Sequence, residues 1–98
     1  MLERLENFLK RVLEIDALFS DPTVISNAEL VSKLAKERAD LIPIVSSYEA
    51  LKNAQQELED AKILANDQDS DVAEMANEEA EKLRLEVDKL ELVLRNAL

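Results

Sequence analysis

Alternating carboxylates in the second half of the chain have the spacing of a calcium-binding loop. Asp67, Asp69 and Asp71 alternate, and Glu78 lies eleven residues after Asp67, as the ligands of an EF-hand loop do. That loop needs glycine at its sixth position, where the backbone turns sharply, but the residue here is the β-branched Val72. The preferred interpretation is that the aspartates cap a following helix and face the positive end of its dipole. No metal or other cofactor is predicted, and a calcium sensor stays as an alternative.

The amino-acid composition removes most routes to catalysis. The 98 residues include no Cys, no His and no Gly, which excludes thiol nucleophiles, the usual zinc ligands and glycine-rich phosphate loops. Paired carboxylates do acid–base chemistry only where a walled pocket shifts their pKa values. A chain with 3% aromatic residues gives little sign of such a pocket, so we predict no enzymatic activity.

The charge is acidic and unevenly spread. The chain has 12 basic and 22 acidic residues, for a net charge of −10, and residues 57–98 hold thirteen acids and five bases. An acidic surface repels nucleic-acid phosphates and anionic lipid, so we expect a basic protein surface as partner and no direct nucleic-acid or membrane binding. No signal peptide is expected, because Glu3, Arg4 and Glu6 interrupt the apolar positions near the start. No apolar run approaches the roughly 20 residues that span a bilayer. A cytoplasmic location is expected.

Hydrophobic periodicity predicts three helices in one domain over residues 1–98. Apolar side chains recur every three or four residues over 2–19, 27–65 and 70–97. Ser26, with Glu29 three residues later, has the pattern of a capping box at the start of the second helix. Pro43 falls inside that helix and loses a backbone hydrogen bond, which predicts a kink or short break near residues 40–43 but not the end of the helix. The apolar stripe of the second helix is expected to continue to Leu64.

The short connection between the second and third helices makes them antiparallel neighbours. The predicted fold is therefore all-α, an elongated three-helix bundle or antiparallel helical hairpin with a kink near Pro43. A heptad-like apolar seam follows on the third helix, formed by Ala76, Ala80, Leu83, Val87, Leu90, Leu94 and Ala97. The candidate partner contacts are carboxylates at and after the turn, namely Asp67, Asp69, Asp71, Glu74 and Glu78. A solvated helix face is the alternative interpretation of this charge run.

Several short motifs follow one another in a recognisable order. They are Asp21-Pro22, Lys36-Glu37, the segment LIPIVSSY at 41–48, Met75-Ala76 and the acidic leucine-rich segment 83–94. Their order and spacing resemble the amino-terminal domain of bacterial class-I peptide chain release factors, of the type that reads UAA and UAG. The resemblance covers essentially all 98 residues.

The resemblance implies an isolated first domain without the family's catalytic centre. That centre contains Gly-Gly-Gln, whereas this chain has no glycine, so no catalytic residue carries over. The implied role is a non-catalytic arm in stop-codon-dependent translation termination. The implied partners are the factor-binding region of the large ribosomal subunit through the full-length factor, the class-II release-factor GTPase, and the glutamine methyltransferase that acts on the full factor.

A free-standing acidic coiled coil that oligomerises is the alternative from another functional class. The heptad-like seam of the third helix supports it, because such a seam also packs against a second copy.

Overall fold

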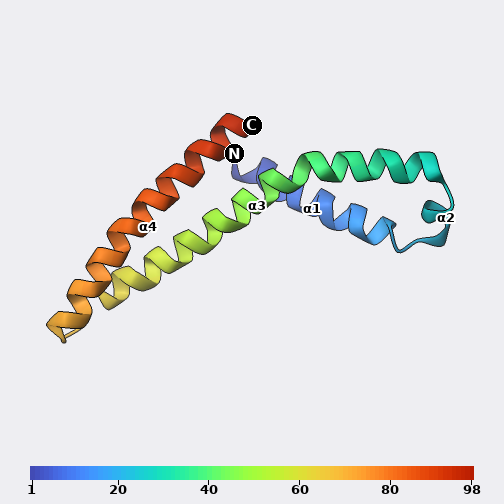
Figure 1. Cartoon of the computed structure of the whole chain (residues 1–98). Coiled ribbons are helices and arrows are strands. Elements are labelled where there is room, and N and C mark those ends of the chain that lie inside the picture. The colour runs from blue at the N-terminus through green and yellow to red at the C-terminus, as the bar shows by residue number, and fades with distance from the viewer. The chain divides into compact units, whose positions relative to one another are not determined.

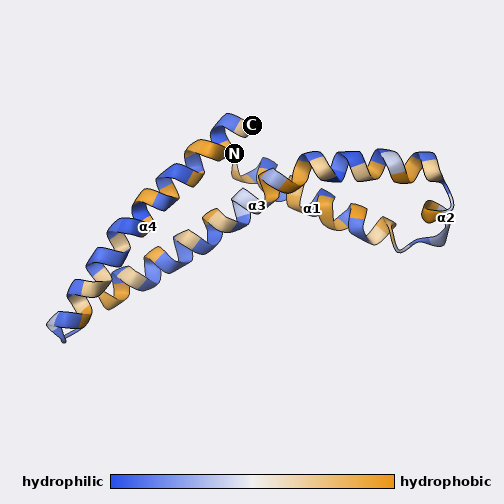
Figure 2. Cartoon of the chain, in the orientation of Figure 1, coloured by the Kyte–Doolittle hydropathy of each residue, from blue (hydrophilic) through white to orange (hydrophobic).

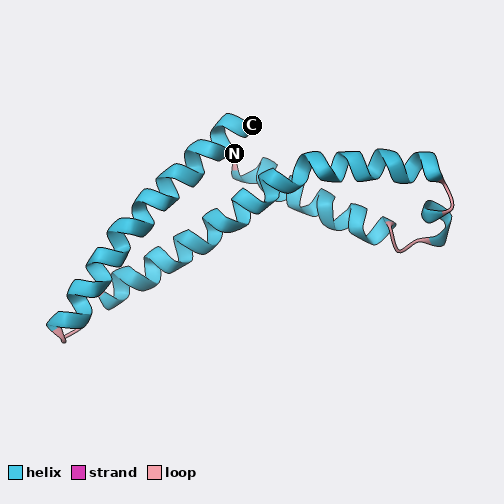
Figure 3. Ribbon diagram, viewed as in Figure 1, coloured by secondary structure: helices cyan, strands magenta, loops and turns pink.

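The structure is a computed structural model that describes residues 1–98, and it consists of four α-helices without strands (Figure 1 and Figure 3). They are α1 (Leu2–Leu18), α2 (Pro22–Ile25), α3 (Ala28–Leu64) and α4 (Ser70–Ala97). The all-α prediction is confirmed. The three long helices begin and end within one residue of the predicted bounds, and the short α2 was not predicted.

The chain divides into two compact units, Met1–Ser46 and Ser47–Leu98. The first contains α1, α2 and the first part of α3, and the second contains the rest of α3 and all of α4. The single domain expected over 1–98 stays a prediction.

In the first unit, α1 runs beside the first part of α3, and α2 lies in the connection between them (Figure 1). A small apolar cluster joins the three helices, formed by the buried Ile15, Val24 and Leu34 with Leu18 and Phe19 packed against it. The long helices contribute because their apolar residues recur at helical spacing on one face, and α2 contributes the single side chain of Val24.

The helix α2 is a short turn that Asp21 and Pro22 make favourable. The Asp21 carboxylate accepts hydrogen bonds from the Thr23 backbone amide at 2.9 Å and from the Thr23 hydroxyl at 2.7 Å. Both bonds lower the pKa of Asp21, and the bond from the Thr23 hydroxyl has the larger effect. Pro22 occupies the first helical position, where its fixed φ fits and its missing N–H has no partner to lose.

The capping box predicted at Ser26 is wrong. The Asn27 side chain accepts a hydrogen bond from the Leu30 amide at 3.1 Å, and α3 begins one residue after Asn27. Ser26 instead ends α2, and its hydroxyl donates to the Thr23 carbonyl at 3.0 Å. Because Ser26 is occupied in that way, the cap of α3 falls to the next polar residue, and asparagine caps as well as serine does.

Pro43 lies exposed inside α3, and the helix is continuous from Ala28 to Leu64. The proline therefore does not end the element, as expected, and the alternative of a short break is not observed. The kink near residues 40–43 stays a prediction.

In the second unit, α4 folds back along α3 as an antiparallel hairpin (Figure 1), and apolar residues recur along both helices between hydrophilic ones (Figure 2). The buried residues here include Leu51, Ala54, Leu58 and Ala61 on α3 and Ala76, Ala80, Leu83 and Val87 on α4. Leu94 of the predicted seam is also buried, Leu90 is half-buried, and Ala97 is exposed.

The apolar stripe of α3 ends earlier than predicted. Ala61 is buried, but Leu64 on the next turn is 50% exposed, although the sequence placed it in the core. The first buried residue of α4 is Ala76, so the leucine has no large buried neighbour on the opposite helix. None of the four helices contains a stretch long and apolar enough to cross a lipid bilayer.

Candidate functional site

The turn between α3 and α4 is built by its aspartates. Directly after α3, the Asp67 amide donates to the carbonyl of Leu64, the last residue of the helix, at 3.0 Å. The Asp67 carboxylate then accepts from the Asp69 amide at 2.9 Å. Asp69 is the N-cap of α4, and its carboxylate accepts from the amides of Asp71 at 2.9 Å and Val72 at 3.4 Å. The predicted helix-capping role is confirmed for Asp69, whereas Asp67 binds an amide ahead of the helix and the Asp71 carboxylate caps no amide.

This geometry differs from that of a calcium-binding loop. The helix α4 begins at Ser70, so Val72, Glu74 and Glu78 all lie on regular helix, whereas an EF-hand loop wraps its ligands around the ion. Asp67 and Asp69 direct carboxylate oxygens to backbone amides. No group of three or more carboxylates in the structure is placed to hold a metal ion.

The remaining predicted contact residues point their charges to solvent. Asp71, Glu74 and Glu78 are exposed, and none of their carboxylates makes an ion pair or accepts a hydrogen bond within the chain. The structure therefore separates the five candidates into two that shape the turn and three whose charges are available to another molecule.

Charge concentrates around this turn more strongly than across the rest of the hairpin. We call residues 59–81 the acidic segment, because it holds nine carboxylates and a single base, Lys62. That lysine is paired with Glu59 at 3.3 Å. The following residues, 82–98, hold three acids and four bases, so the excess of negative charge belongs to the end of the hairpin near the turn.

An apolar groove of about 400 Å³ opens beside the same turn. We call it the turn groove, and it is lined by Ala61, Leu64, Val72, Met75, Ala76 and Glu79. Met75 is 72% exposed and Val72 is 37% exposed, so both apolar side chains are open to solvent ahead of the buried seam. Sequence reasoning missed this groove, because helical spacing does not show where the facing helix stops covering its neighbour.

A second apolar groove lies in the first unit but has no charge bias. It is lined by Phe19, Ile25, Ala28, Val31, Ser32 and Ala35. Residues 19–37 around it hold three acids and two bases. Its surroundings therefore do not favour a partner of either charge.

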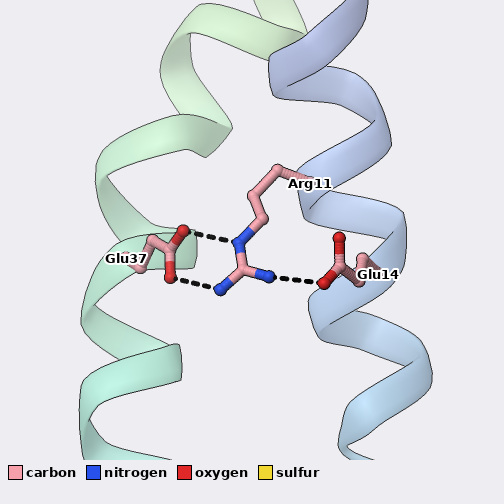
Figure 4. Close-up of polar contacts among 3 residues, drawn as sticks. All are labelled: Arg11, Glu14 and Glu37. Atoms are coloured by element: carbon pink, nitrogen blue, oxygen red, sulfur yellow. Dashed lines mark hydrogen bonds and ion pairs between the residues drawn. The ribbon is translucent and has the colours of Figure 1, made fainter.

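A cluster of charged side chains in the first unit connects α1 with α3 (Figure 4). Arg11 on α1 donates from Nε to Glu37 Oε1 at 2.6 Å and from Nη2 to Glu37 Oε2 at 2.9 Å, and Nη1 donates to Glu14 Oε1 at 2.8 Å. Hydrogen bonding from Arg11 lowers the pKa of Glu37, and the same pairing raises the pKa of Arg11. A second pair joins the same helices, with Arg38 Nε donating to Asp16 Oδ1 at 2.6 Å.

These ion pairs have a structural role. Two parallel bonds between a guanidinium and a carboxylate fix the register of two surfaces as well as their separation. Nothing in the sequence predicted the pair of Arg11 and Glu37, which lie 26 residues apart.

Comparison with known proteins agrees with the predicted resemblance. The PCRF domain matches residues 8–98. The chain is 39% identical to peptide chain release factor 1 of Lawsonia intracellularis over 95 residues, which are 97% of this chain and 26% of that protein. It is 42% identical to the protein of the same name from Clostridium botulinum over 92 residues, 93% of this chain and 26% of that protein.

A third relative is peptide chain release factor 1 of Dehalococcoides mccartyi, 48% identical over 84 residues, which are 85% of this chain and 24% of that protein. The chain thus spans about a quarter of the length of the curated relatives that it matches. No solved structure is significantly similar to it. The match over residues 8–98 and the identity to three release factors show that the chain belongs to the PCRF domain family.

Proposed function

We propose that this chain is the non-catalytic helical arm of a peptide chain release factor and acts in stop-codon-dependent termination through protein–protein contacts at the ribosome. The observation that carries the proposal is the match of residues 8–98 to the PCRF domain, together with 39–48% identity to proteins named peptide chain release factor 1. A factor of this kind acts where translation takes place, so we propose a cytoplasmic location.

The ionisable groups support a role in contacts and not in chemistry. No charged or polar side chain is buried, and a general acid at neutral pH needs a carboxyl whose pKa is raised by burial or by a like charge. The two carboxyls with shifted pKa values, Asp21 and Glu37, are shifted downward by hydrogen bonds. A lowered pKa keeps these two carboxyl groups ionised, and an ionised carboxylate has no proton to donate.

The acidic segment supplies the contact surface in this proposal. Asp67 and Asp69 hold the turn in shape through their bonds to backbone amides. Asp71, Glu74 and Glu78 present charge to solvent from the first turns of α4. The backbone of this helix start is already ordered, so it loses little backbone freedom when it binds, which favours association.

Three partners are proposed from the resemblance to release factors. They are the factor-binding region of the large ribosomal subunit, reached through the full-length factor, the class-II release-factor GTPase, and the glutamine methyltransferase that acts on the full factor. The charge of the segment favours protein contacts within each of these, because nine carboxylates repel a nucleic-acid backbone.

The alternative of an oligomerising coiled coil is not favoured. The seam that would meet a second copy is buried within the second unit at Ala76, Ala80, Leu83 and Val87. A buried seam leaves no a/d surface for another helix to enter.

A peptide-release assay tests the proposed function. Ribosomes that carry a stop codon and labelled peptidyl-tRNA are incubated with the 98-residue chain alone, and no labelled peptide should be released. An excess of the chain added to a limiting full-length release factor 1 should slow release, because the two compete for the same protein contacts.

Charge variants make the assay specific for the proposed surface. The triple variant Asp71→Asn, Glu74→Gln, Glu78→Gln should need a concentration about fivefold higher for the same inhibition. The matched control Glu49→Gln, Glu86→Gln, Asp88→Asn removes the same charge from exposed positions outside the acidic segment and should inhibit as the unmodified chain does. Release by the chain alone would overturn the non-catalytic role, and absence of inhibition at any concentration would overturn the contact role.

A further inference from the structure

The turn groove combines exposed apolar side chains with a strongly acidic setting. Among its lining residues, Ala61 and Ala76 are buried, and we call them the floor. The exposed apolar side chains of Leu64, Val72 and Met75 are its walls. Leu64 is 50% exposed and Met75 is 72% exposed, so large apolar side chains border an open hollow. Apolar surface in this arrangement favours burial against another molecule.

The turn groove lies within the acidic segment, which draws its carboxylates from both helices and the turn. Glu79 lines the groove itself, and the acidic segment that contains the groove has nine carboxylates and only one base. A ligand that enters the groove therefore meets a negative potential around an apolar floor, and cationic groups beside an apolar anchor gain from both.

From this geometry we propose that the turn groove is a docking site for a basic amphipathic helical segment of a partner protein. An apolar side chain of that segment enters between Leu64 and Met75, and lysine or arginine side chains on its flanks meet the surrounding carboxylates. This inference rests on the proposed function and deepens it by naming the chemistry of the partner.

Charge distinguishes this occupant from the other molecules that cover apolar surface. A second copy of the chain would bring its own acidic segment against the first, and like charges brought together oppose association. Anionic lipid and nucleic acid are repelled for the same reason. A basic helix is attracted, and its apolar face supplies anchors at the i, i+3, i+4 spacing that grooves between helices receive.

The side chain of Met75 makes the groove suitable for a helical ligand. Met75 is unbranched and flexible, so it adapts to anchors of different shape. The alanines of the floor leave room for a branched side chain to approach the backbone of both helices. The groove therefore selects for an apolar anchor with basic neighbours more strongly than for one particular residue.

The test uses the complete 98-residue chain and a synthetic probe. The probe is a 14-residue peptide of leucine and lysine arranged to give one apolar and one basic helical face. A peptide of identical composition in scrambled order serves as its control, because it has the charge without the apolar face. Amide chemical shifts of the isotope-labelled chain report where each peptide binds, and calorimetry reports the affinity.

The expected result is that the amphipathic peptide perturbs amides of residues 61–79 and binds more tightly than the scrambled peptide. The variant Met75→Gln should weaken this binding about fivefold or more, because it replaces an apolar wall with a polar one. Leu85→Gln is the matched control: it makes the same kind of change at a 63% exposed position of α4 outside the groove and should leave the affinity unchanged. Circular dichroism of both variants checks that the helices are retained.

Three outcomes would overturn the inference. One is equal binding of the amphipathic and scrambled peptides with no effect of Met75→Gln, which would leave only charge attraction. The second is no binding of either peptide. The third is self-association of the chain that Met75→Gln abolishes, which would make a second copy the occupant.

The inference and the proposed function fail separately. If Met75→Gln loses the peptide but still inhibits the release assay like the unmodified chain, the groove binds basic helices but does not serve termination. If the peptide does not bind and the acidic variants still lose inhibition, the acidic surface remains the contact and the groove is not a site.

Discussion

The Arg11 guanidinium donates three hydrogen bonds to two carboxylates, and two of these bonds cross from α1 to Glu37 on α3. Lysine could not make the same contact, because its ammonium is a single point charge without the planar fork that matches a carboxylate. At this scale a few side chains decide how one helix registers on another, and the contact has a measurable dependence on pH.

The pairing should make the stability of the chain fall in acid. Arg11 lowers the pKa of Glu37 in the folded state, so the contribution is complete above the ordinary glutamate pKa of about 4.3 and is lost as the pH falls through the lowered folded value. The variant Glu37→Gln should therefore be less stable than the unmodified chain at pH 7, and this difference should shrink below about pH 4. Urea unfolding at a series of pH values measures both.

Asp40→Asn is the matched control for this prediction. It removes one carboxylate from an exposed position on the same helix, and Asp40 makes no ion pair in the structure. If both variants changed the pH dependence equally, the pairing with Arg11 would not be its cause.

Single residues also show where sequence reasoning was accurate and where it was not. The Asp69 cap was predicted because an aspartate directly before a run of apolar residues at helical spacing is a signal for the start of a helix. Ser26 and Asn27 are adjacent and both are good caps, so the pattern alone favoured the wrong one. The pair of Arg11 and Glu37 lies 26 residues apart, and no local rule reaches that distance.

At the scale of whole helices, the bounds of the long elements followed from a chain with no glycine and two prolines. Helix formers continue until a turn signal stops them. The helix α2 was not predicted because four residues are too few to show a period. Leu64 was predicted as core for a related reason, since periodicity gives the face of a helix but not the length over which another helix covers it.

The start of α3 offers a direct test of the element boundary. Asn27→Ala removes the acceptor for the Leu30 amide and should lower the free energy of unfolding by about 1 kcal/mol. Ser26→Ala removes a hydroxyl that donates to a carbonyl at the end of α2 and should have a smaller effect. Thermal and urea unfolding of the two variants decide between them, and a larger loss from Ser26→Ala would restore the capping box.

On the scale of the molecule, the acidic segment makes the chain self-repelling. The net charge is −10, and nine carboxylates lie between residues 59 and 81. A charge this far from zero destabilises the compact state through repulsion at low ionic strength. Exposed ion pairs act in the opposite direction, but each contributes only about 0–1 kcal/mol, and salt screens them as well.

Repulsion should win, so sodium chloride should stabilise the fold. Between about 0.01 M and 0.15 M salt the Debye length falls from about 30 Å to about 8 Å, which screens carboxylates on neighbouring turns from one another. The expected result is a rise of a few degrees in Tm, measured by circular dichroism.

The double variant Glu74→Gln, Glu78→Gln should show a smaller rise than the double variant Glu86→Gln, Asp88→Asn, although each pair of substitutions changes the net charge from −10 to −8. A fall in Tm with salt would instead mean that ion pairs such as Arg11 with Glu37 contribute more than the repulsion does, and equal responses of the two variants would mean that the acidic segment is not its source.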